Sequence, residues 1–250
     1  MEHTRRVLFD SMQNFRDLGG WPTPEGPLRY GLLYRADLPW HLTEADRRRI
    51  REMGLGVSLD LRDEPEQMEM PDELREIPGV EYRPMPMLGV EKAKAETRPG
   101  KKSAFAPDFF WGDEYIRMLE NNRPWAGDCI RYLAAEERSV VFHCFTGKDR
   151  TGILAALVLS LCGVPAADVA ADYSVSQIYL RPVYEWMRTN LDDFRGTEVT
   201  YPFYSTDGAN ILAVLDHLRE NYGGTEAFLI ECGAEKDCLE RLRERLIKKA

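Results

Sequence analysis

The sequence predicts an α/β fold with a central, mainly parallel sheet flanked by helices. Short apolar runs alternate along the chain with longer segments that have apolar residues at helical spacing, a pattern typical of βαβ units. The 250 residues, 44% hydrophobic and 10% aromatic, suffice for a sizeable core. Neither an internal repeat nor a long low-complexity tract divides the chain, so we expect one domain over residues 1–250.

The first predicted helix lies in the segment "HLTEADRRRIREMGLG". Thr43 and Asp46 give it a start that resembles a capping box, and Gly54 gives it a stop. Two short runs with strand character follow it, "VSLDL" at 57–61 and "GVEYRPMPM" at 79–87.

Helix, strand and helix then follow one another in the second half of the chain. Residues 111–136 have a helical pattern, with Pro124 well placed in a first helical turn. The run "SVVFH" predicts a buried strand, and a helix from Thr151 to Cys162 is expected to end at Gly163. Helical spacing in the tail predicts three more helices, at 210–221, 225–232 and 236–248.

Two segments do not fit this alternation, 91–108 and 192–207. Long irregular segments inside a compact chain are typical of lids and binding loops, and we expect that role for both. Between residues 91 and 102 the first segment carries five lysines and arginines against two glutamates. This excess either attracts acidic phosphopeptides or phosphoinositides, or only keeps a loop solvated.

Charge and cysteine content exclude several classes of protein. The 33 lysines and arginines against 42 acidic residues give a net charge of −9, which argues against a nucleic-acid partner. The N-terminal segment has no apolar signal region, and the longest apolar run, 153–162, is too short to cross a bilayer. The five cysteines are odd in number and form no CxxC pair, so neither a disulfide framework nor a metal site is expected. No cofactor is expected, and the predicted location is cytoplasmic, with export without a signal left open.

The segment "HCFTGKDRTG", residues 143–152, carries the candidate chemistry. It joins a buried strand to a helix, and a helix N-terminus offers unpaired backbone N–H groups and a partial positive charge to an anion. Gly147 allows a tight turn, and Arg150 offers a planar fork that matches two phosphoryl oxygens. A Walker loop is excluded, because Asp149 follows Lys148 where that motif has serine or threonine.

Cys144 lies at the start of this loop, where the partial positive charge of the helix N-terminus favours its thiolate form. A thiolate at the floor of an anion cradle can take a phosphoryl group, after which water hydrolyses the thiophosphate. The hydroxyl of Thr151 is placed to stabilise the departing thiolate. The sequence therefore predicts a metal-free phosphomonoesterase.

The segment resembles the His-Cys-x5-Arg-Thr/Ser motif of cysteine-dependent protein tyrosine phosphatases. Its Gly-Lys-Asp-Arg-Thr-Gly version is similar to the bacterial and fungal branch that includes a secreted mycobacterial phosphatase, as are "NFRDLGG", "SLDLRDEPE" and "ADYSVSQIYL". The resemblance covers most of the chain. It implies a phosphatase fold with helical lids, Cys144 as nucleophile and Arg150 as phosphate clamp. The phosphate-binding residues that it implies are Phe145, Thr146, Gly147, Lys148, Asp149, Arg150 and Thr151.

Three aspartates compete for the role of general acid. Asp149 lies beside the clamp and matches an acidic residue shared by this branch, so it is preferred. Asp60, at the end of a predicted strand, is the alternative acid. Asp108 follows a proline some distance before the cysteine, as the acid does in eukaryotic tyrosine phosphatases, but it lacks the preceding tryptophan.

The residues around these motifs have expected roles in support. We expect His143 to hydrogen-bond the loop, and Arg62 either reaches the site or braces the sheet. Arg16 and Asp17 are expected to form a structural pair at a tight glycine turn, and contact with the phosphate loop is the alternative for them. Lys148 either holds a phosphoinositide head group or adds charge beside one phosphate.

The leading hypothesis is a protein tyrosine phosphatase acting through a Cys144 thiophosphate. A dual-specificity or phosphoinositide phosphatase with the same mechanism is the alternative. A pseudophosphatase that only binds phosphate is the competing hypothesis outside the enzymes. A sulfurtransferase is a third hypothesis, but it would not need the Arg-Thr-Gly sequence that ends the motif. The sequence makes no prediction about oligomeric state.

Overall fold

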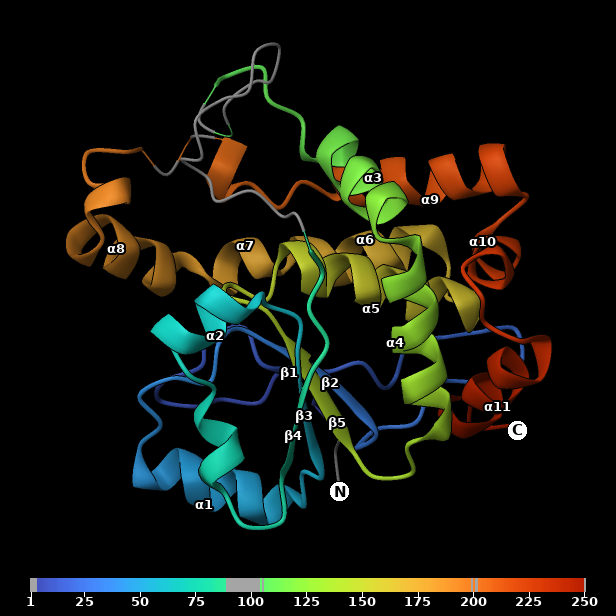
Figure 1. The fold of residues 1–250 in the computed structure, drawn as a ribbon, viewed down its shortest axis with the longest axis horizontal. Helices are drawn as coiled ribbons and strands as arrows, with labels where there is room; N and C mark the ends of the chain where they lie inside the picture. The colour runs from blue at the N-terminus through green and yellow to red at the C-terminus, as the bar shows by residue number, and fades with distance from the viewer. Residues whose placement is uncertain (1–3, 89–103, 105, 199, 201, 250) are drawn as a thin grey trace.

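A five-stranded sheet forms the centre of the protein. The computed structural model describes residues 4–88, 104, 106–198, 200 and 202–249 (Figure 1). The strand order is β1-β2-β5-β3-β4, with β1 antiparallel to β2 and the other three pairs parallel. The strands are β1 (Arg16–Asp17), β2 (Leu33–Ala36), β3 (Val57–Asp60), β4 (Glu81–Pro84) and β5 (Val140–His143). This order confirms the predicted mainly parallel sheet.

Helices cover both faces of the sheet. Successive side chains of a strand point to opposite faces, and the central strand β5 follows this rule. Val140 and Phe142 pack into the larger core, whereas Val141 packs into a second core that includes Ile50. The larger core also contains residues of α4 (Arg123–Ala135), α5 (Asp149–Leu161) and α11 (Lys236–Leu246). Ile50 lies on α1 (Glu44–Met53), which Figure 1 shows on the other side of the strands from α4 and α11.

The ends of α1 confirm the predicted caps. Thr43 Oγ1 accepts a hydrogen bond from the Asp46 amide at 3.1 Å, and Asp46 Oδ2 accepts one from the Thr43 amide at 3.2 Å. Gly54 ends the helix in the left-handed region with φ 64°.

Other boundaries differ from the prediction for local reasons. The predicted helix over 111–136 is two helices, α3 (Trp111–Asn121) and α4, which meet at Asn122 just before Pro124 in the first turn of α4. Helix α5 begins at Asp149, two residues earlier than expected, because the loop itself turns into the helix. The elements that were not predicted include β1, β2, α2 (Glu64–Glu69), α6 (Ala166–Ser174), α7 (Ser176–Tyr179) and α8 (Arg181–Asn190).

The tail helices confirm the predicted spacing within two residues. They are α9 (Gly208–Tyr222), α10 (Thr225–Glu231) and α11. Of the two expected lids, the segment 91–108 lies mostly outside the described residues. The segment 192–207 contains two 3₁₀ turns, Asp192–Phe194 and Pro202–Tyr204, and its Tyr204 packs with Leu180, Tyr184 and Met187 in a separate small core. A further 3₁₀ turn, Glu73–Glu76, follows α2.

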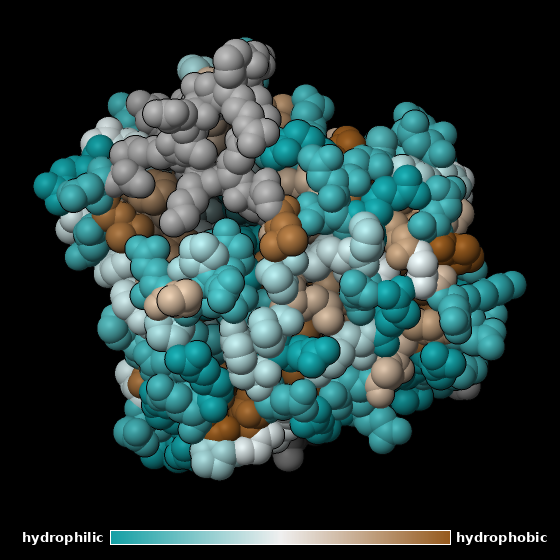
Figure 2. All heavy atoms as spheres, in the orientation of Figure 1, coloured by the Kyte–Doolittle hydropathy of each residue, from teal (hydrophilic) through white to brown (hydrophobic). Residues whose placement is uncertain are grey.

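The surface shown in Figure 2 is mostly hydrophilic, with hydrophobic residues scattered over it in small groups. Within the part of the chain that the structure describes, no helix is long and apolar enough to cross a membrane.

Candidate active site

The segment between β5 and α5 forms a tight loop at the carboxyl ends of the parallel strands. Cys144 begins this loop and is only 2% exposed. Gly147 turns the chain with φ 66°, and a Cβ atom there would lie 2.1 Å from the carbonyl oxygen of Ala36. Only glycine allows the loop to pass so close to the end of β2.

Three successive carbonyl groups of the loop accept hydrogen bonds from residues outside the loop. The Phe145 carbonyl accepts from the Leu38 amide at 2.9 Å, and the Thr146 carbonyl accepts from Asn14 Nδ2 at 3.0 Å. Arg35 donates to the Gly147 carbonyl at 2.7 Å. In a trans peptide the N–H points opposite to the C=O. The amides of residues 146–148 therefore face the other side, where they form a cradle for an anion.

A buried ion network fixes the groups that hold the loop. Asp172 of α6 pairs with Arg16 at 3.1 Å and with Arg35 at 2.6 Å, and all three side chains are at most 2% exposed. Arg16 also donates to Asn14 Oδ1 at 2.6 Å. Burial, with Arg35 close by, lowers the pKa of Arg16 to about 10. The network ties α6 to the back of the phosphate loop.

The expected pair of Arg16 with Asp17 was wrong. Neighbouring side chains of a strand point to opposite faces, so these two residues of β1 point apart. Asp17 instead accepts hydrogen bonds from the amides of Gly19 and Gly31, each at 2.7 Å.

Arg150 lies at the start of α5 and is 6% exposed. Its guanidinium donates two hydrogen bonds to the Glu66 carboxylate of α2, at 2.5 and 2.8 Å. Burial opposes ionisation of Glu66, but Arg150 outweighs it and lowers the pKa of that carboxyl. Sequence analysis missed Glu66, although Asp63 and Glu66 form a capping box that marks the start of α2.

Asp149 is held by a buried phenol. Tyr115 of α3 donates to Asp149 Oδ1 at 2.5 Å, and its hydroxyl also contacts the Tyr173 hydroxyl at 2.6 Å. Burial, together with the Asp149 carboxylate, raises the pKa of Tyr115, so the phenol stays a donor. The bond fixes Oδ1 of the carboxylate, and Lys148 Nζ lies 3.5 Å from the same oxygen.

Thr151 is fully buried, and its hydroxyl has no hydrogen-bond partner among the residues described. An unpaired buried hydroxyl is costly and needs an acceptor. The predicted acceptor is the Cys144 thiolate.

The chain matches the family model described as tyrosine phosphatase family over residues 7–248. It is 31% identical over 212 residues to a tyrosine-protein phosphatase of Nostoc commune, covering 82% of this chain and 70% of the relative. The chain belongs to the tyrosine phosphatase family. Its members are phosphoric monoester hydrolases, as the loop chemistry predicted.

A second relative matches the phosphatase over nearly its whole length. It is 27% identical to the triple specificity protein phosphatase PtpB of Mycobacterium tuberculosis, covering 94% of this chain and 96% of the relative. Among solved structures, Pseudomonas aeruginosa TpbA matches with a TM-score of 0.35 and 15% identity, over 65% of this chain and 90% of that one. The assignment to the family comes from the sequence comparisons.

The carboxyl group of Asp60, the alternative acid, is enclosed by other side chains. It is fully buried, and Arg62 donates to both of its oxygens, at 3.0 and 2.7 Å, while the Tyr82 hydroxyl donates at 3.2 Å. Burial opposes its ionisation, but His143 and Arg62 outweigh it and lower the pKa of Asp60. A carboxylate held ionised in this way is a poor proton donor. Arg62 thus braces the end of β3.

His143 bonds the loop, as expected. Its Nδ1 lies 3.1 Å from the Cys144 carbonyl, and its Nε2 lies 3.2 Å from Asp72 Oδ2. Both partners are acceptors, so the doubly protonated ring satisfies both. Burial alone would lower the pKa of His143, but the carboxylates of Asp60 and Asp72 raise it. In its doubly protonated form the ring places a positive charge beside Cys144.

Lys148 extends towards the segment 192–207, and its ammonium group also lies 3.5 Å from Asp149 Oδ1. Its Nζ donates to the Phe203 carbonyl at 2.6 Å and lies 4.4 Å from the centre of the Trp111 ring. The side chain is 2% exposed, and burial lowers its pKa. In this arrangement the Lys148 ammonium group attaches the segment 192–207 to the start of α5.

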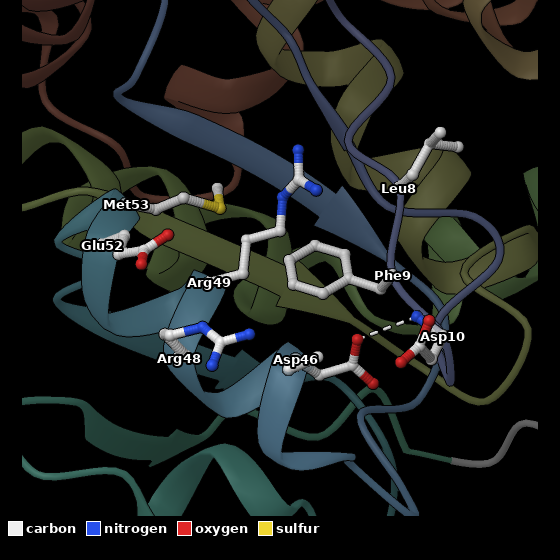
Figure 3. A pocket seen from close by; sticks show the side chains of 9 residues that line it. Leu8, Phe9, Asp10, Asp46, Arg48, Arg49, Glu52 and Met53 are labelled. Atoms are coloured by element: carbon white, nitrogen blue, oxygen red, sulfur yellow. Dashed lines mark hydrogen bonds between the residues drawn. The ribbon is translucent and has the colours of Figure 1, made fainter.

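The described part of the chain also forms hollows outside the phosphate cradle, of which two are relevant here. One, of ≈ 260 Å³, is mostly apolar and includes Phe145 of the loop. The other, of ≈ 560 Å³, lies between the segment 8–10 and α1 (Figure 3). It contains no loop residue, and its Asp46 accepts from the Asp10 amide at 2.8 Å, so this carboxylate serves to attach the N-terminal segment to α1.

Proposed function

We propose that the protein hydrolyses phosphotyrosine in protein substrates through a thiophosphate on Cys144. The observation that carries the proposal is the loop itself, in which the amides of residues 146–148 face away from the bound carbonyl groups and Arg150 lies at the start of the helix that follows Cys144. Such groups stabilise the charge that spreads over the phosphoryl oxygens in the transition state. The whole chain, 1–250, is proposed to act as one phosphatase domain.

In the first step Cys144 Sγ attacks phosphorus, and the bond from phosphorus to the phenolic oxygen breaks. Asp149, which must enter this step protonated, gives its proton to that oxygen, so tyrosine leaves neutral. In the second step Asp149 takes a proton from water, whose oxygen attacks phosphorus, and the S–P bond breaks. The released thiolate accepts a hydrogen bond from Thr151 Oγ1 and lies near the His143 imidazolium.

Arg150 is paired with Glu66 in this structure. Glu66 occupies two of its N–H groups, so a phosphate either displaces that carboxylate or binds the remaining donors. Glu66 thereby holds the guanidinium in place until substrate arrives.

The test is direct detection of the intermediate. We expect rapid quenching in acid during turnover of p-nitrophenyl phosphate to leave one phosphoryl group on the peptide that contains Cys144, as read by mass spectrometry. Turnover should resist EDTA, because in the proposed mechanism a thiolate is the nucleophile and the amides and Arg150 bind the phosphoryl oxygens. Inactivity towards several phosphoesters would overturn the proposal.

Replacing the proposed acid should make the rate depend more strongly on the pKa of the leaving group. We expect Asp149→Asn to lower kcat by about 10²–10⁴-fold for phenyl phosphate, because the phenolate then leaves unprotonated. The loss should be much smaller for p-nitrophenyl phosphate, whose leaving group needs little protonation. The measurement is kcat across aryl phosphates of graded leaving-group pKa.

Asp108→Asn is the matched control for this series, since Asp108 is exposed and was the third candidate acid. It should keep the wild-type dependence on the leaving group. If Asp108→Asn steepened that dependence and Asp149→Asn did not, the assignment of Asp149 would fail.

The second candidate function is a phosphatase of broader specificity. A relative that matches over 94% of this chain is named a triple specificity phosphatase, which favours activity beyond phosphotyrosine. The burial of Lys148 disfavours the phosphoinositide role, because its ammonium is bound to Phe203. A pseudophosphatase would bind phosphate without turnover.

We propose a cytoplasmic location, since all five cysteines are free thiols.

A further inference from the structure

The apolar pocket beside the phosphate loop is formed by residues that the proposed chemistry does not use. Its walls come from the loop that precedes α1, from Met70 after α2 and from the start of α8. Phe145, the residue after Cys144, forms part of the lining, and the Leu38 amide fixes its carbonyl at 2.9 Å. A substrate whose phosphate lies in the cradle can therefore place a neighbouring group in this pocket.

Two tryptophans on different elements form aromatic walls. The rings of Trp40 and Trp186 lie edge to face with their centroids 5.9 Å apart, and Trp186 is 38% exposed. The His41 ring lies 3.8 Å from that of Trp40, and Glu73 holds the His41 amide at 2.7 Å. The wall is thus fixed before a ligand arrives. Aromatic faces attract cations, most strongly those of tryptophan.

A buried carboxylate also lines the pocket. Asp37 is 3% exposed, and it accepts from the amides of Gln13 at 2.8 Å and Asn14 at 2.9 Å. No cationic side chain forms an ion pair with it in the described part of the chain, and His143 acts on it only at longer range. Burial raises the pKa of Asp37 to about 6, although the backbone amides oppose this. A carboxylate buried without a counter-ion attracts a cation.

We propose that this pocket binds the positively charged side chain of an arginine or lysine that flanks phosphotyrosine in a protein substrate. The proposal rests on the proposed function, since the phosphate must occupy the cradle. The apolar stem of such a side chain packs against Val183 and Leu38, while its charged end lies beside the two tryptophans and towards Asp37. The substrate phosphate adds negative charge beside the cations of the loop and so offsets their repulsion of the side chain.

The test compares phosphotyrosine peptides that differ in one flanking residue. An arginine is moved position by position along the peptide, and at each position it is compared with citrulline, which has the same shape without the charge, and with phenylalanine. At one position we expect arginine to raise kcat/KM on the order of tenfold over citrulline. p-Nitrophenyl phosphate, which cannot reach the pocket, serves as the reference substrate in every assay.

Two matched variants locate the effect. Val183→Lys places a competing cation in the pocket, whereas Ile178→Lys places one on α7 outside the lining, at a residue that is 71% exposed. Val183→Lys should remove the preference for arginine and keep the turnover of p-nitrophenyl phosphate, and Ile178→Lys should keep both. Trp186→Leu, which keeps an apolar wall but loses the aromatic face, should weaken the preference in the same way.

Each other outcome overturns the proposal in a distinct way. A preference for phenylalanine would make the pocket an apolar subsite, and equal rates for all peptides would remove it from substrate recognition. An arginine preference that survives both Val183→Lys and Trp186→Leu would place recognition elsewhere. Hydrolysis of p-nitrophenyl phosphate with no turnover of any peptide would reject a protein substrate while the phosphatase chemistry stands. Failure on p-nitrophenyl phosphate itself would reject the proposed function.

Discussion

Replacing Cys144 by serine is expected to abolish turnover and to leave phosphate binding in place. Serine keeps the shape of the loop, but its hydroxyl ionises far less readily than a thiol, and the cradle can no longer supply a nucleophile. We expect a loss of kcat on the order of 10⁶-fold, as measured for a hydrolase that loses its nucleophile. Inorganic phosphate should still bind in titration calorimetry, because the amides and Arg150 remain.

Cys232→Ser provides the matched control. Cys232 is also buried, at 7% exposure, but it ends α10 at a distance in sequence from the loop. This variant should keep the wild-type kcat. A Cys144→Ser protein with more than a trace of wild-type activity, or an equal loss in Cys232→Ser, would contradict the role of Cys144.

The sequence predicted the loop well because its chemistry is contiguous. His143, Cys144 and Arg150 lie within eight residues, and the strand before them and the helix after them have strong local patterns. The parallel sheet followed from the alternation of such patterns. Strand β1, with two residues, has too short a pattern to be predicted.

The residues that position the loop were missed because they come from distant parts of the chain. Glu66 lies 84 residues before its partner Arg150, and Asp172 lies 156 residues after Arg16. Nothing in the sequence around Glu66 or Asp172 indicates that an arginine is its partner. Only the fold, which brings α2 and α6 to the same edge of the sheet, creates these pairs. The same holds for the bond between Tyr115 and Asp149, which depends on how α3 packs against α5.

The apolar pocket shows the same limit. Trp40 and Trp186 have no common pattern in the sequence, and neither was a candidate site residue. Asp37 follows β2 at the edge of the sheet where ligands bind in open α/β proteins, so its position could have been noticed once β2 was predicted.

Asp172→Ala is expected to cost about 3–5 kcal/mol of the free energy of unfolding, the usual cost of removing one partner from a buried ion pair. Arg16 and Arg35 would both remain buried without a counter-charge, since each is at most 2% exposed. Denaturant unfolding followed by circular dichroism measures the change. Asp172→Asn keeps the shape and some of the hydrogen bonds, so it should fall between wild type and Asp172→Ala.

The same change should also lower activity, because Arg35 fixes the Gly147 carbonyl at 2.7 Å and thereby turns the next amide into the cradle. The control is Asp216→Ala, which removes an exposed pair with Arg219 and should leave both unfolding and kcat/KM unchanged. If Asp172→Ala were as stable as this control, the network would not hold α6 to the loop. If it were destabilised but fully active below its unfolding temperature, the network would support the fold without shaping the cradle.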